Sequence, residues 1–154
     1  MRVHLCVVGR LRGGPERALV DDYLSRFDRT GRALGLGPAR VIEVEDRKGG
    51  GMAAEAALLR KAIPQRARIC VLDERGRVQS SPDFAQWMAR LRDAGTQDLA
   101  LVIGGADGID PDLRAEADDA LSFGQMVWPH MLVRVMLAEQ LYRAQTILDR
   151  HPYH

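Results

Sequence analysis

The sequence predicts an α/β domain built on a mostly parallel sheet with helices on both faces. Five short apolar runs alternate along the chain with stretches whose apolar residues recur at helical spacing. Alternation of this kind is typical of parallel strands joined by helical crossovers. The 154 residues match the usual length of one domain, and no linker, repeat or low-complexity block divides them. We therefore expect one domain over residues 1–154.

The first half of the chain is expected to contain three strands and two helices. Pro15 suits the first turn of a helix, and a glycine-rich, charged loop at 45–51 is typical of a mobile connection. Apolar periodicity sets the remaining boundaries. The expected elements are strand 3–8, helix 15–27, strand 39–44, helix 52–63 and strand 68–72.

The second half is expected to contain three helices and two strands. The run Ser81-Pro82-Asp83 offers an N-cap and a first helical turn, and Asp110 followed by Pro111 does the same for a shorter helix. The expected elements are helix 81–94, strand 99–103, a short helix to about residue 117, a weaker strand 120–123 and a long helix 130–150.

Composition excludes several classes of protein. Apolar residues make up 46% of the chain and charged residues 28%, so it is neither disordered by composition nor a membrane protein. The opening MRVHLCVVGR reaches Gly9 and Arg10 too early for a signal peptide, so we expect a cytoplasmic protein with no membrane partner. With 22 basic and 21 acidic residues the net charge is +1, which predicts weak binding to arbitrary RNA or DNA. If RNA is the substrate, its shape must contribute to recognition.

The sequence predicts no metal site. Cys6 and Cys70 lie in short apolar runs, where a thiol usually behaves as a small buried hydrophobe. The tail 151–154 reads HPYH and holds two imidazoles, but zinc would need two further ligands. A frayed chain end is the alternative interpretation of this tail.

Ligands of such sheets bind outside the carboxyl ends of the strands, so the loops after residues 72, 103 and 123 are the candidate site. The loop 104–108 reads GGADG, and glycines here would let a ligand approach the backbone. A dinucleotide turn would follow the first strand, which disfavours NAD. A tight turn without a ligand is the other interpretation.

The segment 122–130 is unusually apolar for a loop, which predicts that it wraps a flat, partly apolar ligand, lies under another chain, or simply packs in the core. The helix that follows has one apolar face, suited to the core or to a dimer contact. Arg134 interrupts its apolar run one turn after His130. A buried cation needs an anionic partner, and we expect either a ligand phosphate or an acid such as Glu139.

Three motifs together resemble the RlmH family of SPOUT methyltransferases. They are LVIGGADG at 101–108, WPHMLVRVMLAEQLYRA at 128–144 and the closing HPYH, and the resemblance extends over all 154 residues. It implies a C-terminal trefoil knot, a rare exception to unthreaded topology, and a homodimer that binds S-adenosylmethionine (SAM). Val127 stands where other members tend to carry Thr.

The resemblance also implies a reaction and a set of site residues. The reaction is methylation of N3 of a pseudouridine in large-subunit (23S) rRNA on assembled ribosomes. The cofactor residues would be Leu72, Gly104, Gly105, Gly124, Gln125, Met126, Val127 and Trp128. The catalytic candidates are His130, Arg134, Tyr153 and His154, with the two tail residues supplied by the same or the partner subunit. Arg134 and His130 would orient the base and stabilise charge on its carbonyl oxygens, and His130 could accept the proton.

Three alternatives stay open from the sequence. A SPOUT enzyme acting on tRNA or on another rRNA position would share the knot and the cofactor loops, although the HPYH tail disfavours it. A module that binds SAM or the ribosome without catalysis is the second, and a nucleotide-dependent oxidoreductase is the third.

Overall fold

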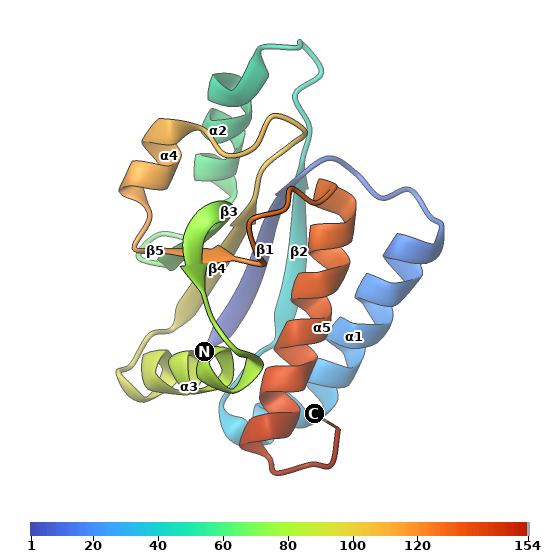
Figure 1. Ribbon diagram of the computed structural model, residues 1–154, viewed down its shortest axis with the longest axis vertical. Coiled ribbons are helices and arrows are strands. Elements are labelled where there is room, and N and C mark those ends of the chain that lie inside the picture. Colours follow the sequence, from blue (N-terminus) through green and yellow to red (C-terminus); the bar gives the residue numbers. More distant parts are fainter. Residues whose placement is uncertain (154) are drawn as a thin grey trace.

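A five-stranded parallel sheet forms the centre of the protein in the computed structural model, which describes residues 1–153 (Figure 1). The strand order is β2-β1-β4-β3-β5, and each neighbouring pair is parallel. The predicted site residue His154 lies outside the described residues. The strands are β1 (Arg2–Val8), β2 (Ala39–Val44), β3 (Arg68–Val78), β4 (Asp98–Ile103) and β5 (Asp119–Ser122).

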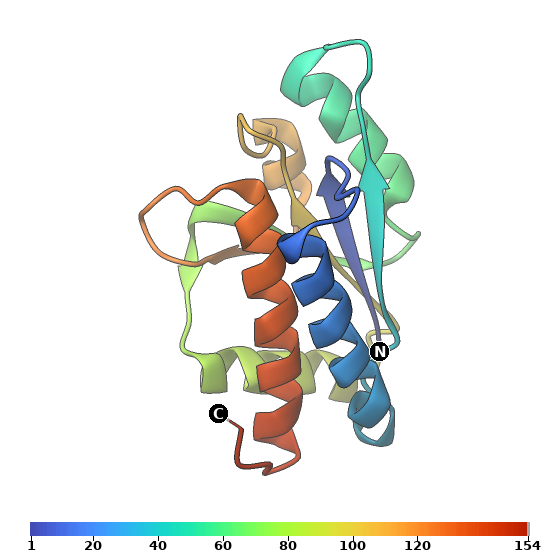
Figure 2. The same cartoon turned by 90° about the vertical axis from the view of Figure 1, so that its right-hand side faces the viewer.

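Helices cover both faces of the sheet, as predicted. α1, α3 and α5 contribute to one apolar cluster on one face, and α2 and α4 contribute to a second cluster on the other face. α5 packs between α1 and α3 (Figures 1 and 2). The helices are α1 (Pro15–Gly31), the short 3-10 helix η1 (Arg32–Leu34), α2 (Gly51–Ala62), α3 (Ser81–Asp93), α4 (Pro111–Glu116) and α5 (His130–Leu148).

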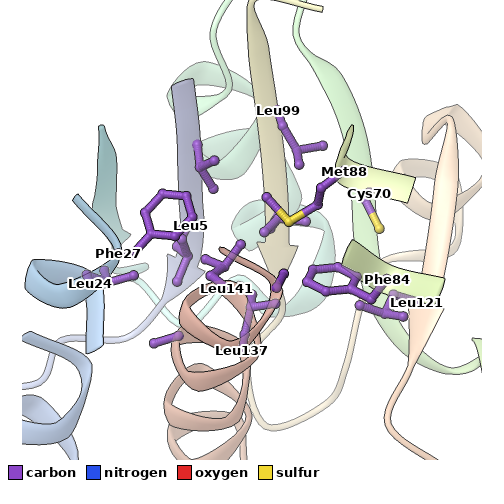
Figure 3. Packing of buried hydrophobic residues seen from close by; sticks show 14 of the residues in the cluster. Leu5, Leu24, Phe27, Cys70, Phe84, Met88, Leu99, Leu121, Leu137 and Leu141 are labelled. Atoms are coloured by element: carbon purple, nitrogen blue, oxygen red, sulfur yellow. The ribbon is translucent and has the colours of Figure 1, made fainter. Parts of the chain in front are cut away.

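Strand alternation divides the core between the two faces. In β1, Leu5 points toward α5 and α1, whereas its neighbour Cys6 packs against α2 (Figure 3). Leu137 and Leu141 of α5 are fully buried against the same face as Leu5. Cys6 and Cys70 are free, buried thiols, which confirms their predicted role as small hydrophobes. Burial raises their pKa values to about 11 and about 12.

β3 is the element that differs most from the prediction, because it continues six residues beyond Leu72 to Val78. An irregularity between Leu72 and Arg77 brings both residues opposite Leu121 of β5. A Cβ atom at Gly76 would lie 2.7 Å from the backbone of Ala120, so only glycine allows this approach. The residues of this extension are mostly polar, so the pattern of apolar residues did not indicate that the strand continues.

The two ends of α5 lie far apart in the molecule. The helix begins at His130 beside the carboxyl ends of the strands and ends near the C-terminus at the opposite end of the sheet (Figure 2). Its 19 residues span about 28 Å at the usual rise of an α-helix. None of the helices in residues 1–153 is long and apolar enough to cross a membrane.

Candidate active site

A cavity of about 480 Å³ lies where residues 72–74 in the middle of β3 meet the loops that follow β4 and β5, so the expected loop after residue 72 is part of a strand. Its volume falls within the range of small-molecule sites. Seven of the eight predicted cofactor residues line it, and only Gln125, which is exposed, does not. The lining residues are Leu72, Asp73, Glu74, Ile103, Gly104, Gly105, Ala106, Gly108, Leu121, Phe123, Gly124, Met126, Val127, Trp128, Pro129, His130 and Val133.

The GGADG loop after β4 folds back on itself, and this explains its glycines. A Cβ atom at Gly104 would collide with the carbonyl of Gly108, and one at Gly105 would lie 2.6 Å from the carboxylate of Glu55. The Gly108 amide donates a 3.0 Å hydrogen bond to the Gly105 carbonyl. Gly104 is therefore required by a backbone contact within the protein, whereas the Glu55 side chain could move away from a Cβ atom at Gly105; the sequence interpretation assigned both glycines to the approach of a ligand.

His130 opens α5 and forms part of the cavity wall. Its ring lies against Gly9, the residue after β1, where a Cβ atom would come within 3.3 Å of His130 Cε1. Burial, together with the charge of Arg134, lowers the pKa of His130 below its ordinary 6.5. Its buried Nδ1 has no hydrogen-bond partner within residues 1–153. The ring is therefore neutral near pH 7, and its Nδ1 lies buried on the side of the Gly9 backbone.

Arg134 forms a clamp with Glu43 and the end of β1 and does not line the cavity. Nη1 donates to Glu43 Oε2 at 2.9 Å, and Nη2 donates to the carbonyls of Val8 and Gly9 at 3.3 and 3.1 Å. The same Glu43 oxygen accepts from the Leu11 amide at 2.7 Å. The clamp thus fixes the backbone that supports the His130 ring.

The partner of Arg134 is an acid of the same chain, which was one of the two expectations, but it is Glu43 and not Glu139. The expected acid, Glu139, lies five residues further along α5 and so points to a different side of the helix. There it pairs with Arg143 at 2.6 Å. Burial lowers the pKa of Arg134, but the guanidinium keeps its charge because its pKa starts from 12.5 and Glu43 opposes the shift.

Asp73 is a site residue that the sequence interpretation missed. It lines the cavity, and its side chain is only 2% exposed. Arg75 donates to both of its oxygens, each at 3.0 Å, and Arg114 approaches within 3.3 Å. These hydrogen bonds, led by that from Arg75, lower the pKa of Asp73 to about 2. The run LDERG at 72–76 can be seen in the sequence, but the contact of Asp73 with Arg114 depends on tertiary structure.

The tail residue Tyr153 lies at the far end of α5 from the cavity of its own chain. Its hydroxyl donates to Glu139 at 3.1 Å, and its carbonyl accepts from the Thr146 hydroxyl at 2.5 Å. Its ring packs 4.9 Å from that of Tyr142. Tyr153 is thus held in place, but it is not brought together with His130.

A second feature of the site is the apolar surface beside the cavity. Met126 and Val127 are 74% and 80% exposed, and Trp128, Met131 and Leu132 are also exposed. A surface of this kind marks a binding region. The core-packing interpretation of the segment 122–130 therefore fails for its middle part, where the apolar side chains face outward.

Metal binding has no support from the described side chains. Within residues 1–153, no group of three or more His, Cys, Asp and Glu side chains is placed to hold a metal ion.

Comparison with known proteins assigns the chain to a family. The profile described as Predicted SPOUT methyltransferase matches residues 1–154. The chain belongs to this family. The match confirms the predicted SPOUT methyltransferase fold and, with it, SAM as the methyl donor.

Curated relatives and a solved structure agree with this assignment. Ribosomal RNA large subunit methyltransferase H of Ruegeria sp. (strain TM1040) is 73% identical, and the protein of the same name from Ruegeria pomeroyi is 75% identical. Each alignment covers all of this chain and 99% of the relative. A probable methylase family protein from Haemophilus influenzae shares the fold at a TM-score of 0.51 and 11% identity, over 96% of this chain and 68% of that one. The resemblance seen in the sequence motifs is thereby confirmed.

Proposed function

We propose that this SPOUT methyltransferase transfers a methyl group from SAM to N3 of a pseudouridine in large-subunit (23S) rRNA, acting in the cytoplasm on assembled ribosomes. The main support is the identity of 73–75% over the whole chain to relatives named for methylation of large-subunit rRNA. The near-neutral charge of +1 fits a folded ribosomal surface better than naked RNA.

The cavity fits SAM by the chemistry of its wall. Leu72, Ile103, Leu121 and Phe123 offer apolar surface for an adenine ring, and the two glycine-containing loops bring backbone polar groups to the same space. When bound, SAM supplies an electrophilic methyl group.

His130 is the candidate proton acceptor. N3 of a pseudouridine carries a proton that must leave as the new N–C bond forms, and a neutral imidazole is a suitable base. The lowered pKa of His130 keeps the imidazole neutral near pH 7, and the residue lines the cavity. It accepts the proton directly or through one water molecule. Arg134 then acts as a positioning residue, because its clamp holds the Gly9 backbone against the His130 ring.

A homodimer would complete the site. Tyr153 of the same chain is held beside Glu139 and Tyr142, about 14–18 Å along α5 from His130, so the tail of that chain does not reach its own cavity in this arrangement. The exposed apolar side chains from Met126 to Leu132 flank the cavity and offer a surface for a second copy. A partner subunit docked there could bring its Tyr153 and His154 to the bound base.

The trefoil knot of the family belongs to the same proposal. β5 pairs with β3, and the segment that follows β5 lines the same cavity as residues 72–74. This proximity supports a knot in which the last part of the chain is threaded past these residues. Protease protection of residues 123–129 in the presence of SAM would test whether the segment is held there.

Nucleoside mass spectrometry of rRNA tests the reaction. Ribosomes are taken from a strain that lacks this gene, incubated with purified protein and SAM, and digested. We expect N3-methylpseudouridine to appear in large-subunit rRNA and to require His130, which His130→Ala would show. A methyl group found on tRNA instead would reassign the substrate, and no transfer to either RNA would favour a noncatalytic binding module.

Mixed dimers test whether the tail acts across subunits. His130→Ala and Tyr153→Ala should each be inactive alone, provided that each still binds SAM. Random mixing of the two makes half of the dimers mixed, and each mixed dimer holds one intact composite site, so about a quarter of wild-type activity should return. If the tail acted within its own chain, the mixture would remain inactive.

A further inference from the structure

Three arginines surround a single carboxylate beside the cavity. Arg10, Arg12 and Arg47 approach Glu45 Oε2 at 3.2, 3.9 and 3.8 Å. Their side chains are 49%, 77% and 77% exposed. Long, exposed ion pairs of this kind stabilise a fold very little. This arginine cluster (Arg10, Arg12 and Arg47) is therefore poorly explained as a structural salt bridge.

The cluster has an excess of positive charge. The loop 9–14 after β1 and the loop 45–50 after β2 together contain four cations, because Lys48 joins the three arginines, against two acids, Glu45 and Asp46. Asp46 is already occupied with the Lys48 and Gly50 amides. Two net positive charges thus gather in two short loops of a chain whose total is +1.

The cluster lies on the His130 side of the cavity. Arg10 follows Gly9, whose backbone contacts the His130 ring, and the Gly9 amide donates to the Val44 carbonyl at 2.8 Å. That bond joins the two loops next to the start of α5 (Figure 2). The Glu43–Arg134 clamp holds the same backbone through hydrogen bonds with the Leu11 amide and the Gly9 carbonyl. The backbone that carries the arginine cluster is therefore held in place at the edge of the site proposed for the target nucleotide.

We propose that the arginine cluster binds backbone phosphates of the rRNA strand next to the target nucleotide. This inference rests on the proposed function. Guanidinium groups pair with phosphate oxygens in a bidentate manner, and contacts to phosphate position a protein on RNA without reading its sequence. Glu45 holds the three side chains together in the absence of RNA. When RNA binds, its phosphates pair with these guanidinium groups, because Glu45 alone cannot neutralise all three.

Ribosome binding by charge variants tests the inference. We compare wild type, Arg10→Ala/Arg12→Ala and Glu45→Gln by co-sedimentation with ribosomes from the deletion strain, at 50 to 200 mM salt, and measure methyl transfer in parallel. The double variant should bind about tenfold more weakly. The affinity of the double variant should also fall less between 50 and 200 mM salt. The fall should be smaller by a factor of about 2.6 for each phosphate that the variant no longer neutralises. Glu45→Gln should bind at least as tightly as wild type, whereas a structural salt bridge predicts that it weakens binding.

The matched control is Arg29→Ala/Arg90→Ala, which removes two exposed arginines from α1 and α3 away from the cavity. It should bind ribosomes and depend on salt as wild type does. SAM affinity and thermal stability should be unchanged in all the variants.

Two results would overturn the inference: equal binding and equal salt dependence of wild type and Arg10→Ala/Arg12→Ala, or a loss of binding in Glu45→Gln that matches the double variant. Wild-type binding with the predicted salt response but without methyl transfer would instead refute the proposed function and leave the arginine cluster as an RNA-binding surface.

Discussion

The clamp between Arg134 and Glu43 leads to a quantitative prediction for Glu43→Ala. The Arg134 side chain is 1% exposed, and breaking a buried ion pair from one side typically costs about 3–5 kcal/mol. Glu43 itself is 26% exposed, so water can enter the vacated space and partly solvate the guanidinium. The Leu11 amide loses its acceptor at the same time. We expect a loss of about 3 kcal/mol in the free energy of unfolding.

Urea denaturation and thermal unfolding at a fixed protein concentration measure this loss. For a chain of this length, about 3 kcal/mol corresponds to a fall in Tm of about 6–12 °C. Glu43→Ala/Arg134→Met removes the buried charge together with its partner and should recover most of the loss. The reasoning is refuted if Glu43→Ala costs less than about 1 kcal/mol, or if the double variant loses the sum of the two single effects.

Three further predictions concern the cavity. Gly104→Ala should weaken SAM binding at least tenfold in isothermal titration calorimetry, because the new methyl group collides with the Gly108 carbonyl and displaces the loop. Asp73→Asn should lower stability by about 2 kcal/mol at pH 7. Because the pKa of Asp73 is lowered from 3.8 to about 2, the contribution is complete above pH 3.8 and is lost as the pH falls through about 2, so denaturation curves of variant and wild type should converge there. The kcat/KM for ribosome methylation should reach half of its plateau at a pH below 6.5, because the active His130 is neutral and its pKa is lowered; a half-maximal point above 6.5 would contradict its role as the base.

The first, second and fourth strands were predicted accurately from the sequence, and the bounds of β2 agree with the prediction at both ends. The boundaries of β1 and β4 differ from the prediction by one residue, because nearly every residue in them is buried and apolar. The extension of β3 was missed, since Asp73, Glu74 and Arg75 carry no apolar signal and their pairing depends on an irregularity opposite Leu121. α1 likewise continues four residues past Phe27, where the apolar face ends but the helix does not.

The sequence predicted which loops form the site, but it predicted the contacts within the site less well. The carboxyl-end rule and the family motifs together indicated seven residues that line the cavity. The partner of Arg134 was wrong because Glu43 lies 91 residues away and becomes its neighbour only through the order of the strands. The sequence interpretation named Glu139 because it follows Arg134 closely in the same helix. The two side chains, however, point to different sides of that helix. Contacts of this range depend on topology, which periodicity does not encode.

The late position of α5 in the chain has a consequence for synthesis. α5 supplies the residues that pack between α1 and α3, the arginine of the clamp and the histidine of the cavity wall. A nascent chain that has emerged only as far as β5 therefore exposes one apolar face of its sheet and has an incomplete cavity. The cavity is therefore complete only after α5 has left the ribosome and packed against the sheet.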